Sequence, residues 1–142
     1  MPWSEEDVIQ ALYIAAQDGT DEAYDWICSK NETPTELLSD IYWKGPSVYI
    51  KYKIVGHENV SEDILMNVVK RTVNTKLLIE VLKSPKITRE IFHKIATKKK
   101  TGGRLFFGSY EFERELMWRD HEFPSWVTEE ISKLKDIRDV IE

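Results

Sequence analysis

The chain of 142 residues is long enough to bury a core of its own, and its 42% hydrophobic and 32% charged content is typical of a soluble globular protein. No apolar run approaches the length of a membrane span, and residues 1–7 lack the basic start and apolar core of a signal peptide. A single cysteine, Cys28, excludes an intramolecular disulfide, so we expect a protein of the reducing cytoplasm.

The net charge of −5 is unevenly distributed along the chain. Residues 1–42 hold one Lys or Arg and ten Asp or Glu, residues 43–104 hold fourteen and five, and residues 105–142 hold five and ten. The three parts therefore carry −9, +9 and −5. A basic middle between acidic ends is typical of electrostatic steering of a partner. It is equally typical of charges that only solvate a helical surface.

Candidate helix N-caps recur along the chain at a regular spacing, which alternates between thirteen and fourteen positions. They fall at Asp7, Thr20, Ser47, Ser61, Asn74 and Thr88, with Pro34 in the slot between Thr20 and Ser47. At that slot we expect Thr33 to be the cap, with Pro34 at the first helical position and Glu36 closing a capping box. Small oxygen-bearing side chains accept hydrogen bonds from the free N–H groups of a helix start, so the spacing predicts a helix at each cap.

Three residues after each cap comes a set of four positions with offsets of one, four and five, which we name the tetrad. These offsets place all four side chains on one helical face. The tetrads are Gln10/Ala11/Ile14/Ala15, Ala23/Tyr24/Ile27/Cys28, Leu37/Leu38/Ile41/Tyr42, Ile50/Lys51/Ile54/Val55, Ile64/Leu65/Val68/Val69, Leu77/Leu78/Val81/Leu82 and Ile91/Phe92/Ile95/Ala96. All members except Gln10 and Lys51 are apolar, so we expect them to be buried, Leu65, Leu78 and Ile95 among them.

Each predicted helix has only about ten residues, which is too short to be stable alone in water. Between residues 33 and 96 these helices come in pairs that form a 27-residue repeat. Stacking on neighbouring pairs must then supply the stability, so we expect an all-α solenoid, or αα-superhelix, forming a single domain over residues 1–142. Its repeats span about residues 6–96.

The pattern breaks after residue 96. Thr101 stands where the next cap is due, but Gly102 and Gly103 follow it and the tetrad fails. We therefore expect an inserted loop over residues 97–108, mobile relative to the repeats, and capping helices over residues 109–142. The two closing helices are predicted at about Tyr110–Arg119 and Ser125–Val140, and His121 echoes His57 in the turn between them.

Gly56-His-Glu-Asn-Val-Ser-Glu-Asp-Ile-Leu65 and Cys28-Ser-Lys-Asn-Glu-Thr-Pro-Thr-Glu-Leu-Leu38 resemble the units of the leucine-rich repeat variant family. The similarity covers residues 20–96, with a weaker echo at 121–131. It implies a right-handed stack of short helices, alternating in that family between α and 3₁₀ type, that serves as a binding scaffold without common catalytic residues. The unit here is longer and lacks most of the prolines. This leaves open a second helix that is fully α, as in HEAT-like or armadillo-like superhelices.

The sequence offers little catalytic chemistry. His57, His93 and His121 lack metal-ligand spacing, and we expect His57 and His121 to make structural hydrogen bonds in matching turns. No phosphate-binding loop is present, and the paired carboxylates fall in first turns or on exposed faces. Cys28 occupies an apolar position, which favours a buried, inert thiol. We therefore expect no enzyme activity, no cofactor and no metal.

Three features indicate a recognition surface. The first is a set of aromatic, apolar and basic residues at aligned outward positions of the second helices, which we name the second-helix ridge: Trp26, Tyr49, Tyr52, Lys53, Lys76 and Ile79. The alternative is that these helices pack on both sides. The second is the basic set Lys51, Lys53, Lys70, Arg71, Lys76, Lys83 and Lys86. The third is the inserted loop, with Lys98–Lys100, Arg104, Phe106 and Phe107, which is either a contact element or a linker folded back onto the core.

These features predict a non-catalytic protein-binding module, a monomer outside its complex, whose partner is a protein with an acidic patch. An immunity protein or inhibitor of a bacterial or phage protein fits the small size and acidic balance. The residues assigned to partner binding are the second-helix ridge with Lys83, Arg104, Phe106 and Phe107. A second hypothesis is nucleic-acid binding by the basic middle, with aromatics as stacking platforms. The acidic flanks argue against it, because they repel a long phosphate backbone.

Overall fold

The computed structural model describes residues 3–100 and 102–141, and side-chain surroundings as far as residue 134. Over this part of the chain the regular structure is helical, which confirms the expected all-α class. The elements are α1 (Glu5–Ala16), α2 (Asp21–Cys28), α3 (Thr35–Trp43), α4 (Val48–Val55), α5 (Glu62–Arg71), α6 (Thr75–Lys83), α7 (Arg89–Ala96), η1 (Phe106–Gly108), α8 (Tyr110–Arg119), η2 (Asp120–Glu122) and α9 (Ser125–Ile141), where η marks a 3₁₀ helix.

Five helices begin at the side chains that the spacing predicts. Each cap accepts a hydrogen bond from the backbone N–H three residues later, at 3.2–3.3 Å. The five caps are Thr20, Ser47, Ser61, Asn74 and Thr88. The closing helices α8 and α9 also begin where expected, and Ser109 caps α8. Thr101 lies outside the described residues.

Two predicted caps are wrong. α1 begins earlier than expected, because Ser4 accepts from the N–H of Asp7 at 3.1 Å and Asp7 accepts in return from the N–H of Ser4 at 3.4 Å. Asp7 is therefore the third residue of a capping box, not the cap. At α3 the cap is Pro34, without a side-chain hydrogen bond. The hydroxyl of Thr33 is buried and donates instead to the carbonyl of Ile27 at 2.5 Å.

The turns after α2, α4 and α6 share one backbone geometry. In each, the first turn residue donates its N–H to the carbonyl three residues before it, at 3.1–3.2 Å. Three residues later a second N–H donates back to the first turn residue's carbonyl, at 3.2 Å. The first turn residues are Lys30, His57 and Ser84, and the second donors are Thr33, Val60 and Ile87. The 27-residue period of the sequence thus reappears in the backbone of these turns.

In the first of these repeats, side chains also join one turn to the next. Nε2 of His57 lies 2.7 Å from the carbonyl oxygen of Lys30, and Nδ1 accepts the N–H of Asn59 at 3.0 Å. The Asn59 amide donates to the carbonyls of Asn31 and Thr33, at 3.0 and 2.9 Å. The structural role expected of His57 is confirmed. His121, by contrast, is an exposed residue of η2 beside Asp120, so the predicted match between the two histidines is wrong.

The tetrads form most of the described core. Those of α3, α5 and α6 are buried throughout, and Leu65, Leu78 and Ile95 are fully buried as predicted. The tetrad of α1 is the exception, because Gln10 and Ile14 are exposed. α1 instead buries its opposite face, through Leu12 and Ala16.

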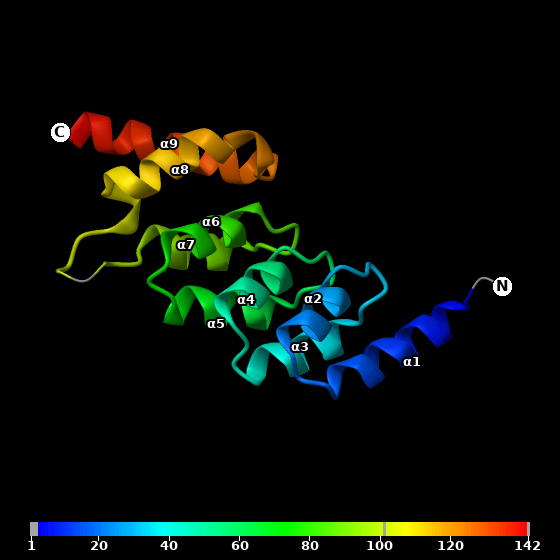
Figure 1. Ribbon diagram of the computed structural model, residues 1–142. Helices are drawn as coiled ribbons and strands as arrows, with labels where there is room; N and C mark the ends of the chain where they lie inside the picture. Colours follow the sequence, from blue (N-terminus) through cyan, green and yellow to red (C-terminus); the bar gives the residue numbers. More distant parts are fainter. Residues whose placement is uncertain (1–2, 101, 142) are drawn as a thin grey trace. The chain divides into compact units, whose positions relative to one another are not determined.

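The chain divides into two compact units, Met1–Asn67 (unit 1) and Val68–Glu142 (unit 2), and the boundary falls inside α5. In unit 1, α2 packs against both α1 and α4, and α3 packs against α4 (Figure 1). In unit 2, α8 packs against α6 and η1, and α7 contacts η1. The expected single domain and solenoid arrangement remain predictions.

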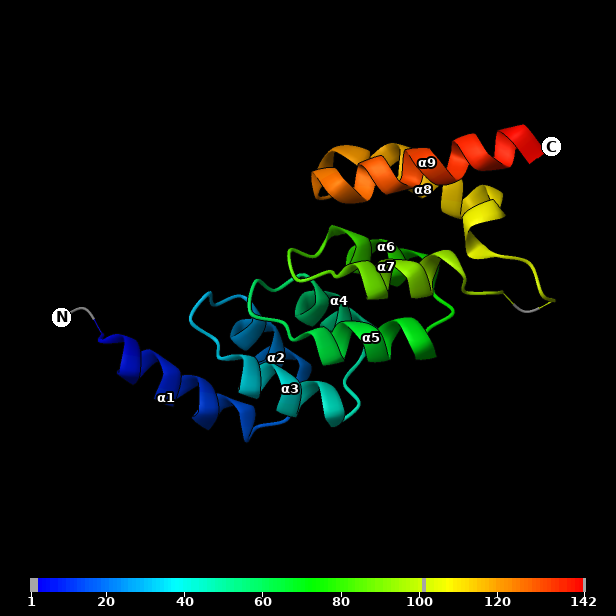
Figure 2. The ribbon, with the colours of Figure 1, turned by 180° about the vertical axis from the view of Figure 1, so that it is seen from behind.

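The loop after α7 turns back on itself before η1 begins (Figure 2). Lys99 and Leu105 form an isolated antiparallel bridge, and Gly102 and Gly103 take positive φ angles of 98° and 87°. Only glycine adopts such angles without strain, so the two residues allow the reversal. Beyond it the chain folds onto the core, because Phe106 is buried and lies near the Phe112 ring of unit 2.

Limited digestion with trypsin is expected to cut first between Lys98 and Arg104. The segment has little regular structure and exposes Lys99 and Arg104, and cleavage needs a stretch of backbone that can leave the surface. Mass spectrometry of early time points identifies the first cut. Cleavage that starts within residues 50–90 would contradict the prediction that residues 98–104 are the most accessible to the protease. In strong urea, where the chain is unfolded, trypsin should no longer cut there first.

Candidate protein-binding surface

The residues of the second-helix ridge differ in their exposure. Trp26 of α2 lies on the same packed helix pair as Tyr49, Tyr52 and Lys53 of α4. Trp26 and Tyr49 keep 40% and 56% of their surface exposed. On α6, Lys76 is exposed but Ile79 is buried at 2% exposure.

The assignment of Ile79 to a partner surface is wrong, because no partner can reach a side chain that is 2% exposed. α6 packs against the closing helix α8, whereas the equivalent positions on α2 and α4, Asp25 and Tyr52, remain half-buried. The alternative interpretation, in which a second helix packs on both sides, is therefore correct for α6.

Charged and aromatic groups hold one another in place on α2 and α4. We name Asp25, Trp26, Lys30, Tyr49, Tyr52 and Lys53 the α2–α4 cluster. The ammonium of Lys53 lies 3.5 Å from Oδ1 of Asp25 and 5.5 Å from the centre of the Tyr49 ring. The hydroxyl of Tyr49 donates to the same carboxylate oxygen at 3.3 Å. The Lys30 ammonium lies 5.5 Å from the centre of the Trp26 ring.

These contacts affect the charge that Lys53 can offer to a partner. Tyr49 and then Asp25 raise the pKa of Lys53 above its ordinary value, so the lysine stays charged throughout the physiological range. Both members of the ion pair remain over two-fifths exposed, and exposed pairs contribute little to stability. The negative charge of Asp25 already balances Lys53 locally.

Sequence reasoning missed Asp25 and Lys30 as members of this surface. A signal for Asp25 was present, because it precedes Lys53 by one full repeat and one further position. In stacked repeats that spacing places two side chains on neighbouring equivalent helices. Lys30 follows α2 and could not be oriented from helical periodicity.

A cavity of about 370 Å³ borders the cluster. Its lining comprises Cys28, Asn31, Tyr52, Lys53, Gly56, His57 and Glu58. Burial raises the pKa of the Cys28 thiol to about 11, so the thiol is protonated at neutral pH and is not a thiolate nucleophile. Both ring nitrogens of His57 are occupied by backbone groups, which leaves neither available for proton transfer. The described residues contain no group of side chains suited to a metal ion.

The remaining residues assigned to partner binding lie in unit 2. Lys83 is half-buried and pairs with Glu80 at 3.0 Å and Glu122 at 3.7 Å, so its charge is already satisfied. Arg104 is exposed, as are the basic-set residues Lys70, Arg71 and Lys86.

Phe106 and Phe107 are buried at 1% and 8% exposure, and their assignment to partner contact is wrong. The Phe106 ring lies 6.1 Å from that of Phe112. The Phe107 ring lies 4.9 Å from Phe112 and 6.0 Å from Phe92. The folded-back interpretation of the loop is confirmed for both.

A second exposed surface on α8 escaped sequence reasoning. Tyr110, Met117 and Trp118 are all largely exposed, and Arg114 stacks over the Tyr110 ring at 6.0 Å. The spacing of these residues places them on one helical face. The sequence of α8 did not show which of its faces is buried, since the exposed face and the buried face both carry large apolar side chains.

No known protein family, curated protein or solved structure matches the chain. The resemblance to the leucine-rich repeat variant family therefore remains a prediction. None of the helices in the described part of the chain is both long enough and apolar enough to cross a lipid bilayer.

Proposed function

We propose that the chain is a non-catalytic protein-binding α-solenoid, and that it contacts its partner through the α2–α4 cluster. An immunity protein or inhibitor of a bacterial or phage protein is the proposed biological type. One observation carries the proposal. Trp26 and Tyr49 stand exposed on two packed helices, and each ring is braced by a charged neighbour.

Aromatic side chains held in this way suit protein recognition. Tyrosine and tryptophan are enriched in binding hot spots, where a large apolar ring and one polar group are buried together. The contacts of Tyr49 with Asp25 and Lys53 restrict the ring before binding. Restriction before binding lowers the entropy lost on association.

The solenoid part of the proposal is supported by the repeated turns and by the helix packing in unit 1. The packing of α2 on α4 joins helices that are equivalent in the 27-residue repeat. The links from His57 to Lys30 and from Asn59 to Asn31 join equivalent turns. Contacts between equivalent elements of successive repeats are what a solenoid is built from.

The proposed partner carries an acidic patch that meets the lysines of the cluster. Lys30 supports this part, because its ammonium has an aromatic ring and no carboxylate as its neighbour among the described residues. Lys53 supports it less, because Asp25 already pairs with it. We therefore expect the exposed rings of Trp26 and Tyr49 to contribute more to partner affinity than the lysine charges.

The second candidate, nucleic-acid binding, has one favourable observation. Lys100 and Arg104 line a cavity of about 520 Å³ together with Tyr110, and neither basic side chain has a carboxylate partner among the described residues. Cations beside an exposed aromatic ring are typical of single-strand binding. Unit 1 works against it, since its four Lys or Arg and thirteen Asp or Glu give it a charge of −9.

Tyr49→Ala is expected to weaken partner binding by about 1–3 kcal/mol, roughly 5- to 150-fold in Kd, and to leave the helical circular dichroism unchanged. The partner is first recovered by affinity capture from source-cell lysate, and Kd is then measured by calorimetry. Tyr49 suits the test better than Tyr52, which is half-buried and lines the cavity.

Further variants and one absorbance measurement sharpen this experiment. Tyr49→Phe keeps the ring and loses only the hydroxyl bond to Asp25, so most of the affinity should remain. Asp40→Ala changes an exposed residue of α3 and should be nearly neutral. Unchanged Kd values for both Tyr49→Ala and Trp26→Ala would reject the cluster as the contact surface. A raised 260 nm absorbance of the purified protein, from bound nucleic acid, would favour the second candidate.

A further inference from the structure

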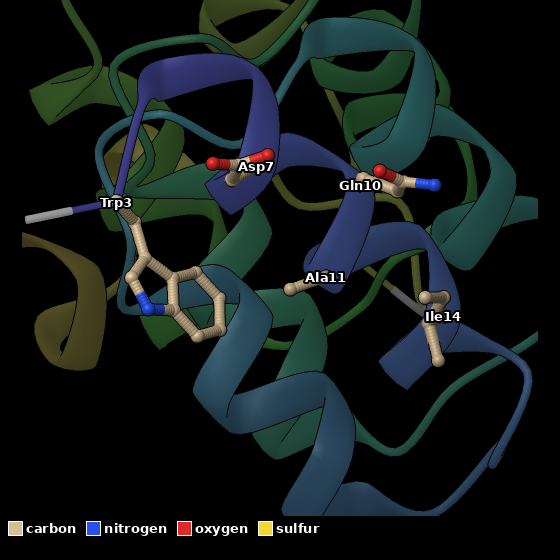
Figure 3. A pocket seen from close by; sticks show the side chains of 5 residues that line it. All are labelled: Trp3, Asp7, Gln10, Ala11 and Ile14. Atoms are coloured by element: carbon tan, nitrogen blue, oxygen red, sulfur yellow. The ribbon is translucent and has the colours of Figure 1, made fainter. Parts of the chain in front are cut away.

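One face of α1 lies open along its length. Trp3, Asp7, Gln10, Ala11 and Ile14 line a groove of about 300 Å³. Figure 3 shows the Trp3 indole and the Ile14 side chain at the two ends of this face, with Ala11 between them. We name these five residues the α1 groove.

The openness of the α1 groove departs from the repeat. Ile14 corresponds to Ile41, one repeat later, yet Ile14 is 62% exposed and Ile41 is fully buried. α1 packs against α2, and its buried residues, Leu12 and Ala16, lie on the face opposite the groove. Apolar side chains that are core elsewhere in the repeat are therefore left without cover by the described residues.

The dimensions of the α1 groove suit a helix. Within α1 the groove residues Asp7, Gln10, Ala11 and Ile14 recur at offsets of three, four and seven, which keeps them on one face, and Trp3 extends the groove beyond the start of the helix. Seven residues of helix rise about 10 Å, close to two turns. An amphipathic helix laid along such a stripe places apolar residues from successive turns against Trp3, Ala11 and Ile14.

The charge around the α1 groove has one sign. Residues 3–29 hold seven Asp or Glu and no Lys or Arg. Asp7 lies in the groove itself, and the exposed Glu6 precedes Gln10 by four residues, one helical turn. A second copy of this groove would bring carboxylates against carboxylates, whereas a helix with Lys or Arg beside its apolar face would pair with them.

We propose that the α1 groove docks a basic amphipathic helix of a partner protein. Its apolar face covers Trp3, Ala11 and Ile14, and its basic residues lie over Asp7 and beside Glu6. The site is distinct from the α2–α4 cluster, because it lies on another helix and takes a ligand of another chemistry. The proposal stands whether or not the cluster binds a protein.

The test uses a synthetic peptide of about five helical turns, made of Leu and Lys with Leu on one helical face, added to the full-length protein labelled with ¹⁵N. The indole N–H signals of the five tryptophans are followed by NMR, and Trp3 is assigned from the signal that Trp3→Phe removes. We expect the Trp3 signal to shift and Ile14→Ser to weaken binding roughly tenfold or more. The same peptide with Glu in place of Lys should not bind.

Matched variants separate this groove from general attraction to an acidic protein. Val48→Ser removes an exposed apolar side chain of α4 without a charge change and should leave Kd unaltered. The variant Glu6→Gln should weaken binding at low salt and much less at high salt. Equal binding to the wild type and Ile14→Ser would overturn the proposal. A concentration-dependent dimer in sedimentation that Ile14→Ser abolishes would also overturn it, since the occupant would be a second copy.

Discussion

Phe106→Ala is expected to lower the free energy of unfolding by about 3–5 kcal/mol. The side chain is 1% exposed and lies against Phe112, so truncation removes apolar burial and leaves a cavity. The ammonium of Lys100 lies 5.6 Å from the ring and loses that contact as well. Chemical denaturation followed by circular dichroism measures the change. If the two units unfold separately, Trp118 and Trp126 fluorescence reports the transition of unit 2.

The neighbouring residue gives the control. Leu105 is exposed, so Leu105→Ala should cost less than about 1 kcal/mol. Equal effects of the two variants would show that Phe106 is not part of the core in solution. The measurement also bears on function, because a Phe106 that binds a partner and not the core would lower affinity with little loss of stability.

Ile41→Ala is expected to cost about 2–5 kcal/mol, whereas Ile14→Ala should change stability by no more than about 0.5 kcal/mol. The two positions are equivalent in the repeat and carry the same residue type, so the difference reports only their surroundings. Ile41 is fully buried and Ile14 is 62% exposed. Chemical denaturation of both variants, followed by circular dichroism, measures the pair.

The Ile14→Ala result tests whether the α1 groove is open in the isolated protein. A large loss for Ile14→Ala in the isolated protein would show that this side chain is already covered. A small loss for Ile41→Ala would instead show that the tetrads are not the core. If the Leu/Lys peptide docks in the groove, Ile14→Ala should lower the free energy of unfolding substantially only when the peptide is present.

Helix positions were predictable because helix starts are local. The hydroxyl of Thr88 caps α7 by accepting a bond from the N–H of Ile91, three residues away. Such a contact depends on a few neighbouring residues and not on the rest of the fold. α1 was misplaced for a reason that is also local, since Ser4 and Asp7 form a reciprocal pair in which either could be taken as the cap.

The candidate surface was predictable only in part. Trp26 and Tyr49 were placed on the outside by the helical period, and they are exposed. Ile79 corresponds to Tyr52 one repeat earlier, which is half-buried, and Ile79 itself is buried on α6, a helix against which α8 packs. The inserted loop intervenes in the sequence between those two helices, and helical periodicity carries no information on which helix a distant segment covers.

The order of residues alone specifies the all-α class, most helix starts, the 27-residue period and the burial of tetrad residues such as Leu78. These follow from side-chain spacing and from hydrogen bonds between near neighbours. Tertiary packing is what makes Phe106 core, leaves Ile14 open and brings Asp25 to Lys53. Each of these depends on what lies against a helix face from elsewhere in the chain. An apolar residue at the right period is equally suited to a core or to a docking surface until its neighbours are in place.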